Sequence, residues 1–438
     1  MAERAKITLI GAGSVEFTRS LLADLCGFAE LHGTLEIALH DIDPGRLATA
    51  ERLARRAVET TGAGYVIAAH PDRAKAFEGA RFLINEIQVG GYDATVRDFE
   101  IPARYGVRQT IADTIGIGGI ARGLRTIPVM VAMGDEMAAR CPDALLLSYT
   151  NPMAMVPWGV YAGSAFANVV GVCHSVRDTH AFLADLVGVP EADITFRTAG
   201  FNHQCFVVRF ERTATGEDLY PIARERVEAD PEGLGRRVRV ELFRRLGYFP
   251  TESSEHSAEY VPWFLHDDAQ IERFRIPVDE YIRRSDENLA EYAAMEAALA
   301  AGDPIELEPG SELASEIVHA MLTGRAREVY GNVRNDGLID GLPADACVEV
   351  PCLVDAGGVR PQRVGALPPQ CLALNRTFLN VVELTVRAAL EGRRDLVYQA
   401  ALLDPNTAAT LPPDLIVAMC DDLLAAHGDL IPEGIRRG

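Results

Sequence analysis

Lysine is the residue that this chain most clearly lacks. Lys6 and Lys75 are its two lysines, although Lys and Arg together number 42. This scarcity disfavours a Walker-type phosphate lysine or a Schiff-base lysine, and with them substrates that carry several phosphates. The formal net charge is −21 and is spread along the chain, so its field repels nucleic acid and anionic lipid. We therefore expect neither nucleic-acid nor membrane partners.

Signals of export and of membrane insertion are also missing. The eight cysteines show no CxxC spacing and mostly fall in apolar segments, which is typical of buried free thiols in a reducing compartment. No apolar run reaches the length of a membrane span, and MAERAKITLIGAG leads into a strand without an apolar leader. We expect a cytoplasmic protein. A length of 438 residues without short repeats favours two domains.

The first segment with a chemical signature is KITLIGAGS (6–14), a β-branched strand that ends in glycines. Gly11 permits a tight turn, Gly13 lets the backbone approach phosphates, and Ser14 opens an amphipathic helix. A helix N-terminus at this point favours a bound pyrophosphate. The fingerprint is imperfect, because Glu16 stands where GxGxxG requires its third glycine. An ordinary strand–helix turn with no ligand is the alternative.

A carboxylate at the end of the second strand strengthens the nucleotide prediction. LEIALHDID (35–43) places Asp41 28 residues beyond Gly13, where it can accept hydrogen bonds from an adenosine ribose and repel a 2′-phosphate. NAD is therefore favoured over NADP.

Alternating strands and helices continue beyond this unit and predict an α/β fold, with a doubly wound Rossmann-type parallel sheet over residues 1–195. Ligands of such sheets bind beyond the carboxyl ends of the strands. Gln88, Asn151 and Cys173 all occupy such ends. The expected elements are a helix at 44–61, a strand at 65–69, a helix at 72–79, and strands at 81–87, 145–149 and 169–173.

Segment 104–128 (RYGVRQTIADTIGIGGIARGLRTIP) interrupts the expected crossover helix with glycines and with Asp113. Its composition predicts a loop that bears on the cofactor or substrate, and a flexible lid without chemistry is the alternative.

The pattern changes after residue 190, where strands joined by a hairpin precede long helices. This order predicts an α+β substrate domain over 196–438, similar to that of lactate and malate dehydrogenases. AGFNH delivers His203 at a turn, 30 residues beyond Cys173, and the two side chains could share a divalent ion. A histidine with a purely structural role at a strand end is the alternative.

Two further segments are rich in polar groups. TESSEHSAEYVPWF (251–264) combines His256 and Tyr260 with several glutamates, among them Glu252, Glu255 and Glu259. YGNVRNDGLIDGLP (330–343) carries Asn332 and Arg334 in a turn-rich sequence that resembles a substrate-contacting loop. From spacing alone, a solvated loop and a well-capped turn explain them equally well.

Taken in order, these segments resemble the NAD- and manganese-dependent glycoside hydrolase family 4, and within it the melibiase-type bacterial α-galactosidase branch. The matching pieces run from residue 7 to about 358 and include ITLIGAGS, ALHDIDP, QVGGYD, QTIADTIGIGGI, YTNPMAM, GVCHSV, AGFNH, GYFPTESSEHSAEYVPWF, YGNVRNDGLIDGLP and CVEVPCLVDAGG.

The resemblance implies an α-galactosidase for unphosphorylated α-galactosides such as melibiose. In this family the sugar is oxidised at C3 by bound NAD⁺, deprotonated at C2, and freed from its aglycone by elimination. Water then adds and the ketone is reduced again, with a divalent metal, usually Mn²⁺, as Lewis acid. The alternatives are an α-glucosidase or α-glucuronidase of the same family, an NAD-dependent 2-hydroxy-acid dehydrogenase, and a non-catalytic NAD-binding sensor.

The resemblance also assigns roles to residues. It implies that Cys173 and His203 bind the metal, although Mn²⁺ generally prefers oxygen ligands. Tyr260 is our predicted C2 base, with His256 and Glu259 as rivals; the general acid is His174 or Asp113, because His174 replaces the aspartate of the phospho-glycosidase branch. The remaining expectations are cofactor contacts at Gly11, Gly13, Ser14, Asp41 and Gln88, substrate contacts at Asn151, His256, Asn332 and Arg334, and a homodimer or homotetramer.

Overall fold

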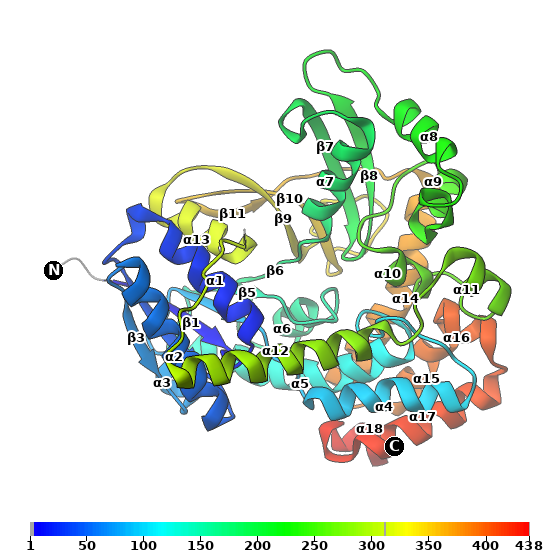
Figure 1. Ribbon diagram of the computed structural model, residues 1–438. Coiled ribbons are helices and arrows are strands. Elements are labelled where there is room, and N and C mark those ends of the chain that lie inside the picture. The colour runs from blue at the N-terminus through cyan, green and yellow to red at the C-terminus, as the bar shows by residue number, and fades with distance from the viewer. Residues whose placement is uncertain (1–3, 311, 438) are drawn as a thin grey trace.

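The computed structural model describes residues 4–310 and 312–437. Its first half is a parallel sheet in the order β3-β2-β1-β4-β5-β6, with helices on both faces, which confirms the predicted Rossmann-type fold (Figure 1). The strands are β1 (Ala5–Ile10), β2 (Leu35–His40), β3 (Val66–Ala69), β4 (Phe82–Asn85), β5 (Leu145–Ser148) and β6 (Val169–Gly171). The helices are α1 (Val15–Gly27), α2 (Pro44–Thr61), α3 (Arg73–Phe77), α4 (Gly91–Arg104), α5 (Gly116–Arg140), α6 (Val156–Gly163) and α7 (Ser175–Val187).

Helix α2 shows how closely local sequence determines an element here. The Asp43 side chain accepts hydrogen bonds from the N–H groups of Gly45 and Arg46, and Pro44 occupies the first helical turn. Gly62 ends the helix in a left-handed conformation, with φ of 68°. The predicted range of 44–61 is therefore confirmed.

The glycine-rich segment differs from its prediction. The loop ends at Ile115, and the GIGG stretch forms the start of α5. These glycines serve close packing, because a Cβ on Gly118 would lie 2.7 Å from the Ala112 Cβ, and one on Gly119 would lie 2.8 Å from the Thr114 carbonyl carbon. The prediction of a loop through residue 128 was therefore wrong: helix α5 packs directly against the buried segment 109–115.

The sheet continues into the second half of the chain through strand β9, which pairs antiparallel with β6. Beyond it the order is β10, β7 and β8, with β11 paired to β10. Because the sheet is shared, the division into residues 1–195 and 196–438 stays a prediction. These strands are β7 (Ile194–Phe201), β8 (Gln204–Arg212), β9 (Arg327–Arg334), β10 (Cys347–Asp355) and β11 (Gly358–Pro361).

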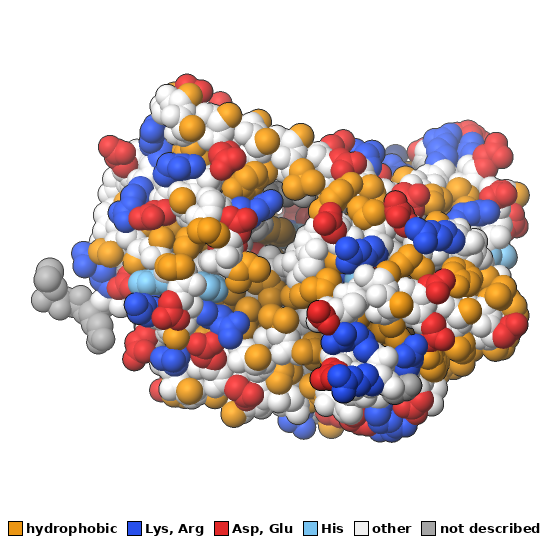
Figure 2. Space-filling model, turned by 90° about the horizontal axis from the view of Figure 1, so that it is seen from below, with side chains coloured by type: hydrophobic (Ala, Val, Ile, Leu, Met, Phe, Trp, Pro, Cys, Tyr) orange, Lys and Arg blue, Asp and Glu red, His pale blue; other side chains and the backbone are white. Residues whose placement is uncertain are grey.

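The helices of the second half pack mainly on other helices. The C-terminal helices α14 to α18 pack beside α4 and α5, while α12 crosses in front of the parallel sheet (Figure 1). Acidic and basic side chains are interspersed on the face in Figure 2, which has a hollow near its middle. The helices are α8 (Tyr220–Ala229), α9 (Val238–Leu246), α10 (Ser254–Glu259), α11 (Asp268–Phe274), α12 (Glu280–Ala301), α13 (Leu313–Thr323), α14 (Pro369–Glu391), α15 (Arg394–Leu403), α16 (Pro405–Thr410), α17 (Pro413–His427) and α18 (Glu433–Arg437).

No helix within residues 4–310 and 312–437 is long and apolar enough to cross a bilayer.

A buried ion pair joins α4, α5 and α17. Both carboxylate oxygens of Asp98 accept from the Arg125 guanidinium, at 3.0 and 2.6 Å, and Oδ1 also lies 2.8 Å from His427 Nε2. The side chains of Asp98 and Arg125 are 2% and 0% exposed. Removing one partner of such a pair strands the other charge in the interior.

We expect Asp98→Asn to lower the free energy of unfolding by about 3–5 kcal/mol, because Arg125 would remain buried and charged without a counter-ion. The measurement is the urea midpoint followed by circular dichroism. Glu287→Gln, which removes an exposed ion pair with Arg283, is the control and should cost less than about 1 kcal/mol. Equal midpoints for the two variants would contradict a structural role for the pair.

Candidate active site

The predicted polar residues converge at the carboxyl edge of the parallel sheet. Cys173 lies two residues beyond the end of β6, and Asn151 lies three residues beyond the end of β5. His203 approaches from the second half, because Phe201 pairs with Gln204 and leaves Asn202 and His203 as a two-residue turn between β7 and β8. The turn gives His203 a φ of 67°, and its Nε2 lies 3.4 Å from Cys173 Sγ. The structure therefore brings the two predicted metal ligands together.

The orientation of the His203 ring follows from a chain of hydrogen bonds. Thr114 Oγ1 donates to Asp113 Oδ1 at 2.8 Å and lies 2.8 Å from His203 Nδ1. Because a hydroxyl has one proton, and Thr114 gives it to the carboxylate, the hydroxyl must accept from His203 Nδ1–H. A neutral ring protonated at Nδ1 carries its lone pair on Nε2, the atom that faces Cys173. Burial first, and then His256, lower the pKa of His203 to about 4, so the neutral ring is favoured.

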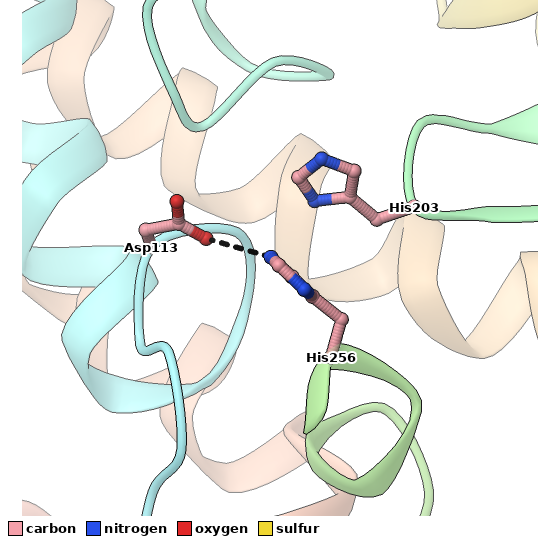
Figure 3. A group of neighbouring side chains, drawn as sticks. All are labelled: Asp113, His203 and His256. Atoms are coloured by element: carbon pink, nitrogen blue, oxygen red, sulfur yellow. Dashed lines mark ion pairs between the residues drawn. The ribbon is translucent and has the colours of Figure 1, made fainter. Parts of the chain in front are cut away.

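Asp113 is the central acceptor of the site. Asn151 Nδ2 donates to its Oδ2 at 2.7 Å, and His256 Nε2 forms an ion pair with Oδ1 at 3.6 Å (Figure 3). Burial opposes ionisation of Asp113, but its bond to His256 and nearby positive charge outweigh burial and lower the pKa of Asp113. The carboxylate is thus ionised and holds its neighbours in place.

His256 lies between two carboxylates. Its Nδ1 is 3.3 Å from Glu252 Oε1, opposite the contact with Asp113, and its ring centroid is 4.3 Å from that of His203. Burial opposes the charged form, yet Glu252 and Asp113 together raise the pKa of His256 to about 10. A protonated imidazole cannot accept a further proton, so His256 does not suit the role of C2 base.

Glu259, the other rival for the base, has a structural task. Its Oε1 accepts from the backbone N–H groups of Thr110, Ile111 and Ala112 at 2.6–3.1 Å. These bonds hold the segment that carries Asp113, in which Ala112 has a φ of 56°. Burial raises the pKa of Glu259 to about 7, against the effect of those backbone donors.

Tyr260 lies against the His203 ring, on the side of Nδ1. Its hydroxyl is 3.4 Å from His203 Nδ1, and the side chain is buried. Burial, and next the charge of Asp113, raise the pKa of Tyr260 well above its ordinary value. Tyr260 is well placed for a base, but only added positive charge would make it an effective one at neutral pH.

The His174 side chain contacts Glu312, whereas the side chain of its neighbour Cys173 contacts His203. Its Nε2 lies 3.0 Å from Glu312 Oε2, and its ring stacks near Tyr149, with centroids 5.9 Å apart. The hydrogen bond to Glu312 raises the pKa of His174 despite partial burial. His174 therefore remains available as a proton donor, although its partner belongs to the start of α13.

The two predicted substrate contacts on β9, Asn332 and Arg334, differ in their surroundings. Asn332 is fully buried, and its Nδ2 donates to Glu349 Oε1 at 3.2 Å and to the Gly171 carbonyl at 3.3 Å. Because β9 runs antiparallel to β6, the residues after Asn332 lie progressively farther from the carboxyl edge of the parallel sheet. Arg334 is exposed and pairs with Asp336. Substrate contact by Asn332 and Arg334 therefore stays a prediction, with internal partners for Asn332 and an exposed ion pair at Arg334.

The nucleotide-binding turn has the expected form. Gly13 N–H donates to Asp41 Oδ2 at 2.9 Å, and a Cβ on Gly13 would lie 2.6 Å from that oxygen. Ser14 N–H closes the turn onto the Gly11 carbonyl at 2.9 Å. Ile42 follows Asp41 and is 94% exposed, which offers an apolar surface for an adenine ring. Gln88 is exposed near the start of α4 and donates to Thr95 Oγ1 at 2.7 Å.

Three important residues escaped the sequence reasoning. Thr114 directly follows Asp113, but its orienting role depends on a histidine 89 positions away. Glu349 is a charged residue within the apolar strand CVEVPC, and this pattern was a detectable signal of a buried polar contact. The sequence marks Glu252 only as one of several acids in segment 251–264.

Comparison with known proteins identifies the family of the chain. A model described as "Family 4 glycosyl hydrolase" matches residues 6–189, and one described as "Family 4 glycosyl hydrolase C-terminal domain" matches residues 198–407. The chain belongs to glycosyl hydrolase family 4. The family resemblance stated from the sequence is therefore confirmed.

Members of family 4 match the chain over nearly its whole length. An α-galactosidase of Bacillus subtilis (strain 168) is 43% identical over 432 residues, covering 98% of this chain and 99% of the relative. An α-galactosidase of Rhizobium meliloti (strain 1021) is 34% identical over 442 residues, covering 98% and 89%. The structure of a 6-phospho-α-glucosidase from gut microorganisms, in complex with NAD and Mn²⁺, superimposes with a TM-score of 0.82 at 20% identity, covering 98% and 100%.

Loss of the Thr114 hydroxyl should disturb the His203 ring. We expect Thr114→Val to weaken binding of a divalent cation by about 10–100-fold, because Nδ1–H would lose the acceptor that fixes the tautomer and the ring orientation. Titration with Mn²⁺, followed by the electron paramagnetic resonance signal of the free ion, measures this affinity. Thr114→Ser keeps the hydroxyl and should bind as the wild type does; weakening by both variants would contradict the proposed hydrogen-bond chain.

Proposed function

We propose that the protein is an NAD- and divalent-metal-dependent α-galactosidase that hydrolyses small unphosphorylated α-galactosides such as melibiose. The observation that supports this most strongly is the meeting of Cys173 Sγ and His203 Nε2, 3.4 Å apart, beside the Asp113 network. The α-galactosidase relatives, 43% and 34% identical, favour a galactoside as the substrate.

Both implied cofactors fit the residues that are present. The glycine turn lies beside Asp41, whose carboxylate oxygens each retain a lone pair for a ribose hydroxyl. Cys173 and His203 offer a thiol and an imidazole lone pair at one point, with a carboxylate of Glu252 close by. When bound, NAD⁺ supplies a hydride acceptor and donor for C3, and the divalent cation supplies a Lewis acid for the sugar oxygens.

The chain's own residues then divide the remaining tasks. Asn151 has a buried Oδ1 without a hydrogen-bond partner among the described residues, so it can accept from a sugar hydroxyl. Tyr260 is the proposed base for the C2 proton, because its hydroxyl lies against His203. His174 is the proposed proton donor, since Asp113 is held ionised by its partners.

We further propose a cytoplasmic homodimer or homotetramer. The free state of the eight cysteines, seven of them buried, suits a reducing compartment. The acidic net charge of −21 disfavours nucleic-acid and anionic membrane partners.

The reaction is tested with an aryl α-galactoside, NAD⁺ and Mn²⁺ in D₂O. We expect galactose that carries deuterium at C2, no accumulation of NADH, and loss of turnover on addition of a chelator, because C2 is deprotonated and the hydride returns to C3. Mass spectrometry and absorbance at the NADH band measure these outcomes. Stoichiometric NADH, without release of galactose, would instead favour a 2-hydroxy-acid dehydrogenase.

The Cys173–His203 pair carries its own test. Cys173→Ser should lower kcat/KM by at least about 100-fold and reduce Mn²⁺ affinity, because the thiolate ligand is lost. Cys352→Ser alters a buried cysteine on β10 and is the matched control for removal of a thiol. Activity of the Cys173→Ser variant equal to that of the control would contradict a metal-binding role.

A further inference from the structure

A cation held by Cys173 and His203 alone would have one soft ligand and one borderline ligand. Mn²⁺ and similar divalent ions prefer oxygen donors, so a carboxylate of the protein beside the pair would suit the ion. Glu252 meets this need: ligand atoms of Cys173, His203 and Glu252 all lie within 4.8 Å of one another. Atoms bonded to a common ion at about 2.0–2.3 Å lie roughly 3–4.5 Å apart, so small side-chain adjustments suffice.

Glu252 has an unusual backbone conformation, which hydrogen bonds to its N–H and carbonyl groups hold in place. Its φ is 68°, a left-handed value that is uncommon for a residue other than glycine. Its N–H donates to Thr179 Oγ1 at 3.3 Å, and its carbonyl accepts from Arg239 Nη1 at 2.7 Å. Ser253 then caps α10. Such strain persists where the surroundings impose it, and here it accompanies a carboxylate of 20% exposure beside Cys173 and His203.

A second group of potential ligands, Asp113, His203 and His256, meets the same distance limit. Its atoms are already engaged, however. Both oxygens of Asp113 accept hydrogen bonds, and His203 Nδ1 donates to Thr114. An ion at this position would also have to displace the ion pair between His256 and Asp113. An ion bound by Cys173, His203 and Glu252 would leave the hydrogen bond of His203 Nδ1 intact, because it would use the free lone pair on Nε2.

The charges of the first group also suit a divalent cation. A thiolate and a carboxylate together balance two positive charges, with His203 neutral, and one proton leaves Cys173 on binding. His256 Nδ1, 3.3 Å from Glu252 Oε1, adds a positive charge beside this carboxylate. Three protein ligands leave positions open for substrate oxygens.

We propose that Glu252 is a third protein ligand of the divalent cation, so that the metal site consists of Cys173, His203 and Glu252. This inference rests on the proposed function, because it concerns the metal on which that function depends. Glu252, which precedes the N-cap Ser253 of α10, would bind the ion. His256 would keep its ion pair with Asp113.

The test measures Mn²⁺ binding to the full chain without NAD⁺ or sugar, so it does not depend on turnover. Glu252→Gln should weaken binding by about 100-fold or more, beyond the range for an outer-shell partner. Glu255→Gln removes the same charge three residues along and should stay within about twofold of the wild type. Wild-type affinity in Glu252→Gln, or equal loss in both variants, would overturn the proposal.

Loss of charge beside His256 could weaken binding without any bond to the metal, and two measurements separate these causes. The Co²⁺-loaded protein should change its d–d absorption in Glu252→Gln, because the coordination changes, but not in Glu255→Gln. The double variant Glu252→Gln/His256→Gln should bind as weakly as Glu252→Gln alone. An unchanged spectrum together with restored affinity in the double variant would overturn ligation by Glu252.

Cys173→Ser distinguishes failure of this inference from failure of the proposed function. If Cys173→Ser loses Mn²⁺ binding and Glu252→Gln retains it, the two-ligand site stands and Glu252 is no ligand. If the wild type and Cys173→Ser bind Mn²⁺ equally poorly, the metal-dependent function and the inference fail together.

Discussion

The direction of one imidazole lone pair governs the chemistry available to this site. Asp113 accepts the Thr114 hydroxyl proton, Thr114 in turn accepts from His203 Nδ1–H, and His203 Nε2 therefore faces Cys173. Reversal of any bond in this chain would turn a donor toward the thiol and remove the ligand atom. The surrounding structure protects the order: Glu259 holds three backbone N–H groups of the loop that carries Asp113.

Buried negative charge is the second constraint. Asp113 and Glu252 stay ionised because they share His256, whereas burial raises the pKa of both Glu259 and Glu349 to about 7. Burial likewise raises the pKa of Cys173 to about 12. A site with this surplus of acidic groups favours a bound cation, which would let a thiolate form at Cys173.

The shared sheet explains how the two halves contribute to one site. Strand β9 pairs with β6 at Gly171 and with β10 along its whole length, so the sheet runs without a break from the nucleotide-binding turn to the β7–β8 hairpin. Glu349 on β10 pairs in register with Gly200 on β7 and accepts from Asn202 Nδ2. The hairpin turn that presents His203 is therefore held by strand β10, through a hydrogen bond between residues 147 positions apart.

The amino-acid sequence by itself determined the elements whose causes are local. The glycine turn after β1, the acid at the end of β2 and the caps of α2 act within a few residues, and so do the apolar strands that place Cys173 and Asn151 at one edge. Tertiary structure decided everything that depends on partners far along the chain. Glu259 accepts hydrogen bonds from backbone N–H groups, whereas Glu252 lies near Cys173 and His203. The sequence alone could not distinguish these roles, because both residues are glutamates in one short polar segment. It also could not show that GIGG begins a helix or that Asn332 is buried against Glu349, since close packing of α5 and the pairing of β9 with β10 arise only when distant segments meet. Local propensity acts through neighbouring residues, whereas the protonation and orientation of a buried side chain depend on whichever groups folding brings within a few ångströms.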